Sequence, residues 1–225
     1  MLNSSTPFPM VKKPLADFQI IIDALRPFAN LLSNTKKKKL PLVYSGKPVC
    51  YLILEGNGAV FRNLDSIIIG NTRAPSLFGL TNVLFPLRDE YYWKTEENSL
   101  VMIIDAHKVR EIISKENLWQ HFAVTLAYYS YHLNENHAKL TANSSLDMIY
   151  LQIYSFMQEP IEIQLKNSLT KYILERTFIS RSYVMKIVSE LKAANLIVFN
   201  GKFLVHIDSS LTTNKARLLN PQEFI

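Results

Sequence analysis

The stretch SLTKYILERTFISRSYVMKIVSELKAANLIVFNGKFLVH, residues 168–206, contains two short helical patterns close together. Both patterns have apolar residues at helical spacing: Leu169, Tyr172 and Ile173 in the first, and Val184, Ile187, Val188 and Leu191 in the second. Ser180 stands directly before the second pattern, where its hydroxyl can accept a hydrogen bond from a free amide of the first helical turn. The spacing therefore predicts a helix-turn-helix with its turn at 177–179.

The second predicted helix keeps its polar residues near its N-terminal end, off the apolar stripe. A recognition helix needs this arrangement, because its N-terminal side chains meet base edges in the major groove of DNA. We expect Arg181 to make a bidentate contact with guanine, and Thr170 and Lys202 to hold the phosphate backbone. The predicted DNA-contacting residues are Thr170, Ser180, Arg181, Ser182, Tyr183, Lys186 and Lys202.

A β-hairpin is predicted directly after these helices. Two runs rich in β-branched and aromatic residues, 196–199 and 202–205, are separated by Asn200-Gly201. Asn-Gly favours a type I′ turn, which needs positive φ at both central positions. A helix pair followed by a hairpin indicates a winged helix-turn-helix. The alternative is an ordinary pair of antiparallel helices beside a small sheet.

Basic residues concentrate toward the C-terminal end of the chain. From Lys166 onward the sequence has nine Lys or Arg against four Asp or Glu, whereas the first 165 residues have sixteen against fifteen. A basic module on a near-neutral body is typical of a protein that binds phosphate backbones. A solvated basic surface is the alternative that charge alone leaves open.

Length and composition indicate a globular protein. The 225 residues suffice for one large or two small domains, and 48% of them are hydrophobic. The sequence shows neither the roughly 18 uninterrupted apolar residues of a membrane span nor the apolar core of a secretory signal. Cys50 is the single cysteine, so it has no intramolecular disulfide partner. We therefore expect a cytoplasmic protein without a membrane partner.

The first half of the chain has a different character. After a loose arm at 1–14, apolar spacing predicts a helix over 15–32, bent at Pro27. Short strands are then expected at 49–54, 59–62, 66–69, 91–94 and 100–104. Strands at this spacing indicate a sandwich or barrel. The four-lysine run 36–39 is interpreted as a solvated loop, with contact to flanking phosphates as the alternative.

Helices are expected again after Asp105. The pattern predicts a helix over 106–114, a long one over 117–140 and another over 146–158, which Ser145 would cap and Pro160 would end. The long helix carries apolar residues in heptad spacing, with one polar residue: Trp119, Phe122, Leu126, Tyr129, Leu133, Asn136 and Leu140. We expect this stripe to be a dimer seam, because a palindromic DNA site requires a two-fold protein. Packing of the stripe against the β domain is the alternative.

The order of elements resembles the Crp/Fnr superfamily of bacterial transcription regulators. The likeness is most specific at Ser180-Arg181-Ser182-Tyr183 and Asn200-Gly201-Lys202, which match that family's recognition helix and wing. Arg73-Ala74-Pro75, Phe78-Gly79-Leu80 and Arg176-Thr177 are similar to the enterobacterial inhibitors of hydrogen peroxide resistance. The resemblance implies an α+β fold with three parts. These are an N-terminal helix with a cyclic-nucleotide-binding-like β-roll (1–115), a long dimerisation helix (116–142) and a winged helix-turn-helix (143–225).

The chain departs from the cyclic-nucleotide-binding members of that family. Those members hold the ribose with a Gly-Glu pair and the cyclic phosphate with an Arg-Ser pair about ten residues later. Here the first pair is Gly79-Leu80, and Glu90-Tyr91 aligns with the second. A carboxylate at the phosphate position repels the ligand, so the departure disfavours cyclic AMP. We predict no cofactor.

Patterns for other chemistry are missing or incomplete. His132 and His137 are five residues apart, whereas a zinc-protease helix needs two histidines four apart with a glutamate after the first. The sequence contains no cysteine cluster, and nothing selects one of the five histidines as a haem ligand. Cys50 lies in an apolar strand, where a buried thiol is more usual than a peroxide-sensing one. We expect neither an enzyme nor a metal site.

The sequence thus predicts a homodimeric, sequence-specific DNA-binding transcription regulator. The resemblance adds an oxidative stress response as the candidate process, and RNA polymerase as a candidate partner beside double-stranded DNA. A protein-interaction module with a degenerate winged helix is the alternative from another class. Binding of DNA with a steep inverse salt dependence distinguishes the two.

Overall fold

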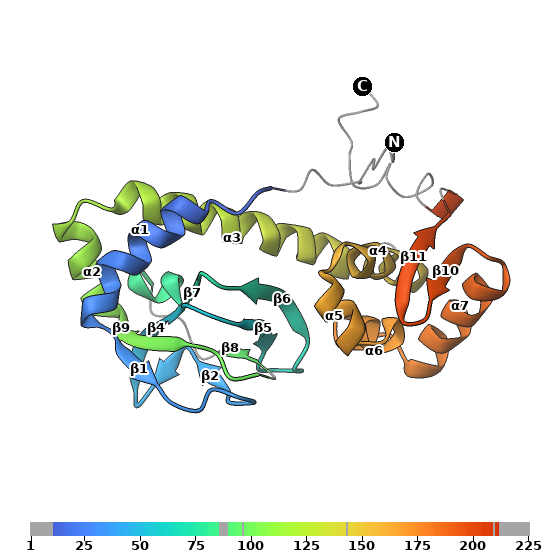
Figure 1. Ribbon diagram of the computed structural model, residues 1–225, viewed down its shortest axis with the longest axis horizontal. Coiled ribbons are helices and arrows are strands. Elements are labelled where there is room, and N and C mark those ends of the chain that lie inside the picture. Colours follow the sequence, from blue (N-terminus) through green and yellow to red (C-terminus); the bar gives the residue numbers. More distant parts are fainter. Residues whose placement is uncertain (1–10, 86–89, 96, 143, 209, 212–225) are drawn as a thin grey trace, which may run out of the picture. The chain divides into compact units, whose positions relative to one another are not determined.

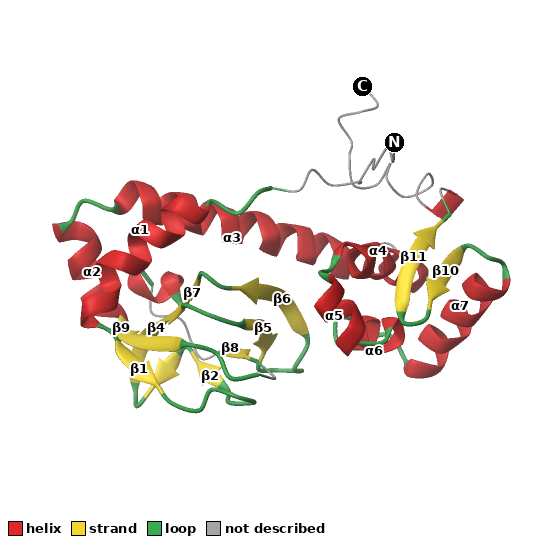
Figure 2. Ribbon diagram, in the orientation of Figure 1, coloured by secondary structure: helices red, strands yellow, loops and turns green. Residues whose placement is uncertain are grey.

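The computed structural model describes residues 11–85, 90–95, 97–142, 144–208 and 210–211 (Figure 1). It divides into two compact units, residues 12–134 and the residues from 135 onward. The first unit combines two antiparallel sheets with helices. The second contains helices and a single hairpin among its described residues (Figure 2).

Two sheets form the β-roll of the first unit. In one sheet the strands follow the order β1 (Asn30–Leu32), β9 (Val101–Asp105), β4 (Lys47–Ile53) and β3 (Val43–Tyr44), and β7 (Ser76–Phe78) also pairs with β4. The other sheet has the order β2 (Leu40–Pro41), β8 (Tyr91–Lys94), β5 (Asn57–Arg62) and β6 (Ile68–Arg73). These strands all pair in antiparallel fashion, which is why short turns suffice to connect them. The expected strand at 66–69 is displaced to β6, because Ser66 has a left-handed φ of 57°.

Large side chains fill the space between the two sheets. Trp93 and Tyr51 are fully buried there, and the Tyr51 ring stacks on Phe78 with ring centroids 6.1 Å apart. Gly58 lies directly under the indole: a Cβ at this position would be 2.3 Å from a ring carbon of Trp93. The close approach of Trp93 therefore requires glycine at position 58.

Helices cover the outside of the roll. A second core joins one apolar face of α1 (Leu15–Leu25) to α2 (Ala106–Lys115) and to α3 (Trp119–Leu140). The short 3-10 helix η2 (Leu80–Val83) adds Leu80 and Val83 to this core. Asp105 caps α2 by accepting a hydrogen bond from the amide of His107 at 2.8 Å.

The predicted helix over 15–32 ends earlier than expected. α1 stops at Leu25, a 3-10 turn η1 spans Arg26–Phe28, and β1 begins at Asn30. Pro27 causes the change, since it has no amide hydrogen to continue the helical ladder. The apolar residues that follow pair with β9 instead of extending a helix.

The second unit is built on one compact core. Its helices are α4 (Ser145–Gln158), α5 (Ile161–Lys166), α6 (Leu169–Leu174) and α7 (Arg181–Ala193), and its hairpin is β10 (Ile197–Asn200) with β11 (Phe203–Ile207). The core joins Ile149, Ile153 and Phe156 of α4 to the apolar stripes of α6 and α7 and to the hairpin. Among the described residues, no helix has the length and apolar character needed to cross a membrane.

Two local predictions in this unit are wrong by one residue. α4 is capped by Ser144, whose hydroxyl accepts from the amide of Asp147 at 3.1 Å, rather than by Ser145. The turn of the hairpin is Gly201-Lys202, because Asn200 pairs with Phe203. Gly201 has a φ of 61° and Asn200 has no positive φ, which fits a type II′ turn rather than the predicted type I′ turn.

Candidate nucleic-acid interface

Side-chain hydroxyls fix the ends of the two helices of the helix-turn-helix. Ser168 caps α6, accepting from the amide of Lys171 at 3.2 Å, and Ser180 caps α7, accepting from the amide of Tyr183 at 3.4 Å. Thr177 is buried in the turn and donates to the carbonyl of Ile173 at 2.9 Å. The predicted N-cap at Ser180 is confirmed, and these bonds set where α7 begins.

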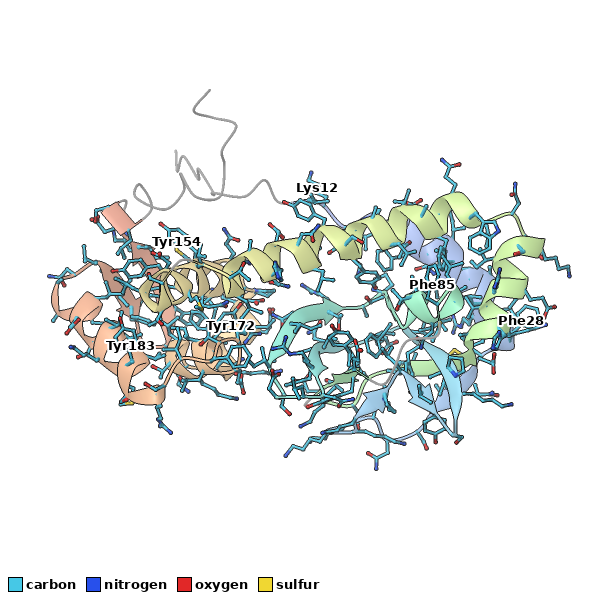
Figure 3. The ribbon with its side chains drawn as sticks, turned by 180° about the vertical axis from the view of Figure 1, so that it is seen from behind. Lys12, Phe28, Phe85, Tyr154, Tyr172 and Tyr183 are labelled. Carbon is cyan, nitrogen blue, oxygen red and sulfur yellow. The ribbon has the colours of Figure 1, made fainter. Side chains whose placement is uncertain are left out.

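Arg176 holds the start of the turn. Its guanidinium lies 3.6 Å from the centroid of the Tyr172 ring, labelled in Figure 3. The Tyr172 hydroxyl donates to Glu159 Oε1 at 2.7 Å, which ties α6 to the end of α4. Burial raises the pKa of Tyr172, so this hydroxyl stays protonated and remains a donor. Arg176 is thus held in place by contacts within its own unit.

α7 separates a buried face from an exposed basic one. Val184, Ile187, Val188 and Leu191 are buried, whereas Arg181, Ser182 and Lys186 are exposed. The Nζ of Lys186 lies 3.9 Å from Oε1 of Glu190, and both side chains are exposed. An exposed ion pair of this kind contributes little to stability. The ammonium of Lys186 is therefore easily released to a phosphate or a base.

The remaining predicted contact residues differ in position. Lys202 is exposed in the turn of the wing, and Thr170 is half-buried on α6. Tyr183 lies in the first turn of α7 and is 37% exposed. Figure 3 labels Tyr183 on α7. The DNA-contacting role of each of these residues stays a prediction.

Sequence reasoning overlooked two residues on the same face of α7. Met185 is 52% exposed, and Ser189 is exposed as well. They follow Arg181 at intervals of four residues, so the three side chains lie along one side of the helix. The signal was present in the spacing, but an apolar Met next to buried Val184 looks like a core residue until its exposure is known.

Residues of the heptad stripe on α3 have unequal surroundings. Phe122 is 2% exposed in the core of its unit. The buried Tyr129 hydroxyl donates to the carbonyl of Leu77 at 2.5 Å and accepts from the Leu77 amide at 3.1 Å. Leu133, in contrast, is 52% exposed. Phe122 and Tyr129 therefore pack within their own unit, which is the alternative interpretation that the sequence left open for them.

The segment that aligns with the family's ribose-binding pair lies in the core of the unit. Leu80 is 3% exposed and packs with the helices. Gly79 has a left-handed φ of 92°, and a Cβ here would be 2.5 Å from the carbonyl oxygen of Val49. Glycine at this position is required by that close approach, independently of any ligand.

The thiol of Cys50 is enclosed. Its Sγ donates to the carbonyl of Gly79 at 3.1 Å, and its side chain has no exposed surface. Burial, assisted by the charge of Asp105, raises the pKa of the Cys50 thiol far above its usual range. Since the thiolate is the reactive form, these surroundings suit a structural cysteine.

Comparison with known proteins identifies the fold of this chain. Residues 145–211 match a family model described as winged helix-turn-helix DNA binding. The c-di-GMP responsive global regulator CLP of Xanthomonas campestris superposes with a TM-score of 0.66 at 14% identity, covering 84% of this chain and 99% of that one. A CRP-family transcriptional regulator of Thermus thermophilus superposes with a TM-score of 0.59 at 16% identity, covering 79% of this chain and 93% of that one. The chain has the fold of Crp/Fnr regulators with a winged helix-turn-helix of DNA-binding type.

A curated relative adds a narrower likeness. The chain is 25% identical to the inhibitor of hydrogen peroxide resistance of Escherichia coli K12 over 201 residues, 88% of this chain and 96% of the relative. The predicted fold class and the predicted resemblance are confirmed. Among the described residues, no group of three or more His, Cys, Asp or Glu is placed to hold a metal ion.

Proposed function

We propose that this chain is a homodimeric, sequence-specific DNA-binding transcription regulator. The observation that carries the proposal is the exposed basic face of α7, where Arg181 and Lys186 project from a capped helix whose opposite face is buried. In a winged helix-turn-helix this helix enters the major groove, and the wing residue Lys202 reaches the backbone. The bound protein would then alter transcription through contact with RNA polymerase.

Selection of genomic fragments tests this function. We would incubate the purified protein with sheared genomic DNA and sequence what it retains, from about 50 mM salt up to physiological salt. A few enriched, roughly palindromic sites, bound with a steep inverse salt dependence, support the proposal. If no DNA is bound even at about 50 mM salt, the protein-interaction module becomes the better account.

We assign the dimer seam to the outward face of α3. Phe122 and Tyr129 are excluded from it, because both pack inside their own unit. The exposed residues that follow one another at intervals of three or four are Ala123, Ala127, Ser130 and Asn134, with Val124 beside them. Small side chains let two helices approach closely, and a second copy of the chain matches the two-fold symmetry of a palindromic site.

We expect Ala127→Arg to weaken the dimer. Ala127 is exposed, so the monomer tolerates the larger side chain, but an unpaired charge in a helix seam raises the dissociation constant by roughly 30-fold or more. Sedimentation equilibrium measures the change, and Ser114→Arg on α2, also exposed, is the matched control. An unchanged dimer in Ala127→Arg would exclude this face.

The roll is proposed to work without a cyclic nucleotide. Leu80, at the position of the family's ribose-binding carboxylate, is buried in the core, and Trp93 with Tyr51 fills the space between the sheets. Isothermal titration with cyclic AMP should therefore give no heat of binding. A measurable affinity would contradict this part of the proposal.

The target genes are proposed to include a hydrogen peroxide response. The name of the relative, an inhibitor of hydrogen peroxide resistance, supports this assignment. Deleting the gene should change survival of the host after a peroxide challenge, and an Arg181→Ala copy should fail to restore the original phenotype. Equal survival of deletion and parent strains would remove the stress role and leave DNA binding intact.

Cys50 is expected to be inert in the folded protein. Burial keeps it as a thiol, and access to its Sγ is blocked. A chromogenic disulfide reagent should therefore react with much less than one thiol per native chain, and with one after unfolding in guanidinium. Rapid stoichiometric reaction of the native protein would revive Cys50 as a peroxide sensor.

A further inference from the structure

The exposed face of α7 contains one apolar side chain among polar ones. Met185 lies one turn after Arg181, three residues after Ser182 and one turn before Ser189, and all four are exposed. More than half of the Met185 surface is accessible to solvent. The residue therefore lies within the part of the helix that the proposed function directs into the major groove.

Met185 is not needed for the core of its unit. The buried stripe of α7 is complete without it, because Val184, Ile187, Val188 and Leu191 supply that face. Tyr183 precedes Met185 by two residues, so on a helix of about 3.6 residues per turn the two side chains point to opposite sides. Single apolar residues are common on protein surfaces, but this one accompanies the residue predicted to read guanine.

The major groove offers a specific partner for such a side chain. Base edges there present hydrogen-bond donors and acceptors, and the apolar group among them is the C5-methyl of thymine. The methionine thioether has no hydrogen to donate and is only a weak acceptor, but its flexible chain adapts to the shape of a methyl group. Burying both groups removes apolar surface from water on each side of the interface.

We propose that Met185 reads a thymine methyl group in the half-site, next to the base pair that Arg181 contacts. The inference rests on the proposed function and adds a second kind of readout to it. Arg181 selects by hydrogen bonds and Met185 selects by apolar contact. A half-site should accordingly contain a thymine at a fixed distance from the guanine.

Deoxyuridine substitution tests the contact directly, because it removes the methyl and leaves every hydrogen-bonding group of thymine in place. Each thymine of an enriched site is replaced in turn, and affinity is measured by fluorescence anisotropy. With the wild-type protein, one position per half-site should lose affinity about three- to fivefold, the value expected for one buried methyl. With Met185→Ala, the same substitution should have no effect.

A matched variant controls for general changes in the protein. Met157→Ala removes another exposed methionine, at 40% exposure on α4, and should keep the full sensitivity to deoxyuridine. Thermal unfolding of both variants verifies that they fold. Equal sensitivity of wild type and Met185→Ala would overturn the inference, and so would a site in which no thymine methyl matters. Failure to bind any specific site would instead overturn the proposed function.

Discussion

Arg181→Ala is expected to lower affinity for the specific site by about 10- to 100-fold while random DNA is bound nearly as before. The reason is that a bidentate guanidinium–guanine contact contributes about 1–3 kcal/mol of discrimination against a wrong base. Arg181 is exposed at the first turn of α7, so its truncation removes no buried contact. Competition titrations with specific and random duplexes measure both affinities.

Lys202→Ala is the matched control for Arg181→Ala. Lys202 is an exposed cation in the turn of the wing, where a phosphate contact carries no sequence information. Its loss should weaken specific and random DNA to a similar degree and reduce the salt slope by about one. If Arg181→Ala also reduces both affinities equally, Arg181 is a backbone contact and the predicted guanine readout is wrong.

Local signals explain why the helix-turn-helix was predicted correctly from the sequence. The cap at Ser180 and the apolar stripe of α7 depend on residues within one or two turns, and both have the predicted geometry. The turn of the hairpin illustrates the limit of such signals. Asn200-Gly201 favours one turn type, but the pairing of Asn200 with Phe203 shifts the turn by one residue.

The heptad pattern of α3 exposes a deeper limitation. A core face and a dimer seam both require apolar residues at the same spacing, so the pattern alone does not distinguish them. The structure identifies the core face, because Phe122 is buried in its own unit whereas Ala127 is exposed, and the seam on the exposed face stays a proposal. Small residues such as Ala127 carry little apolar signal, and sequence reasoning therefore overlooked that face. Met185 was overlooked because an apolar side chain gives no signal of base contact until its exposure is known.

The open edge of β7 is completed by one side chain from α3. One side of β7 pairs with β4, where Leu77 lies opposite Leu52. The amide and the carbonyl of Leu77 are both hydrogen-bonded to the Tyr129 hydroxyl. The Ser76 hydroxyl lies 2.9 Å from the same oxygen. An unpaired strand edge is normally covered or blocked in native proteins. Here the Tyr129 hydroxyl covers the edge of β7, because it donates one hydrogen bond to the carbonyl of Leu77 and accepts another from the amide of Leu77.

Tyr129→Phe is therefore expected to destabilise the first unit strongly. The ring remains, so packing against Phe18 is kept, but the amide and carbonyl of Leu77 lose their shared partner in a buried place. One unsatisfied buried polar group costs about 1–3 kcal/mol, and the substitution leaves two of them, so the unfolding free energy should fall by about 2–6 kcal/mol. Urea denaturation followed by circular dichroism measures the unfolding free energy.

Tyr44→Phe is the control, because it removes the hydroxyl of an exposed tyrosine in the same unit. It should change stability by less than about 0.5 kcal/mol. Similar midpoints for wild type and Tyr129→Phe would mean that water replaces the hydroxyl at the β7 edge.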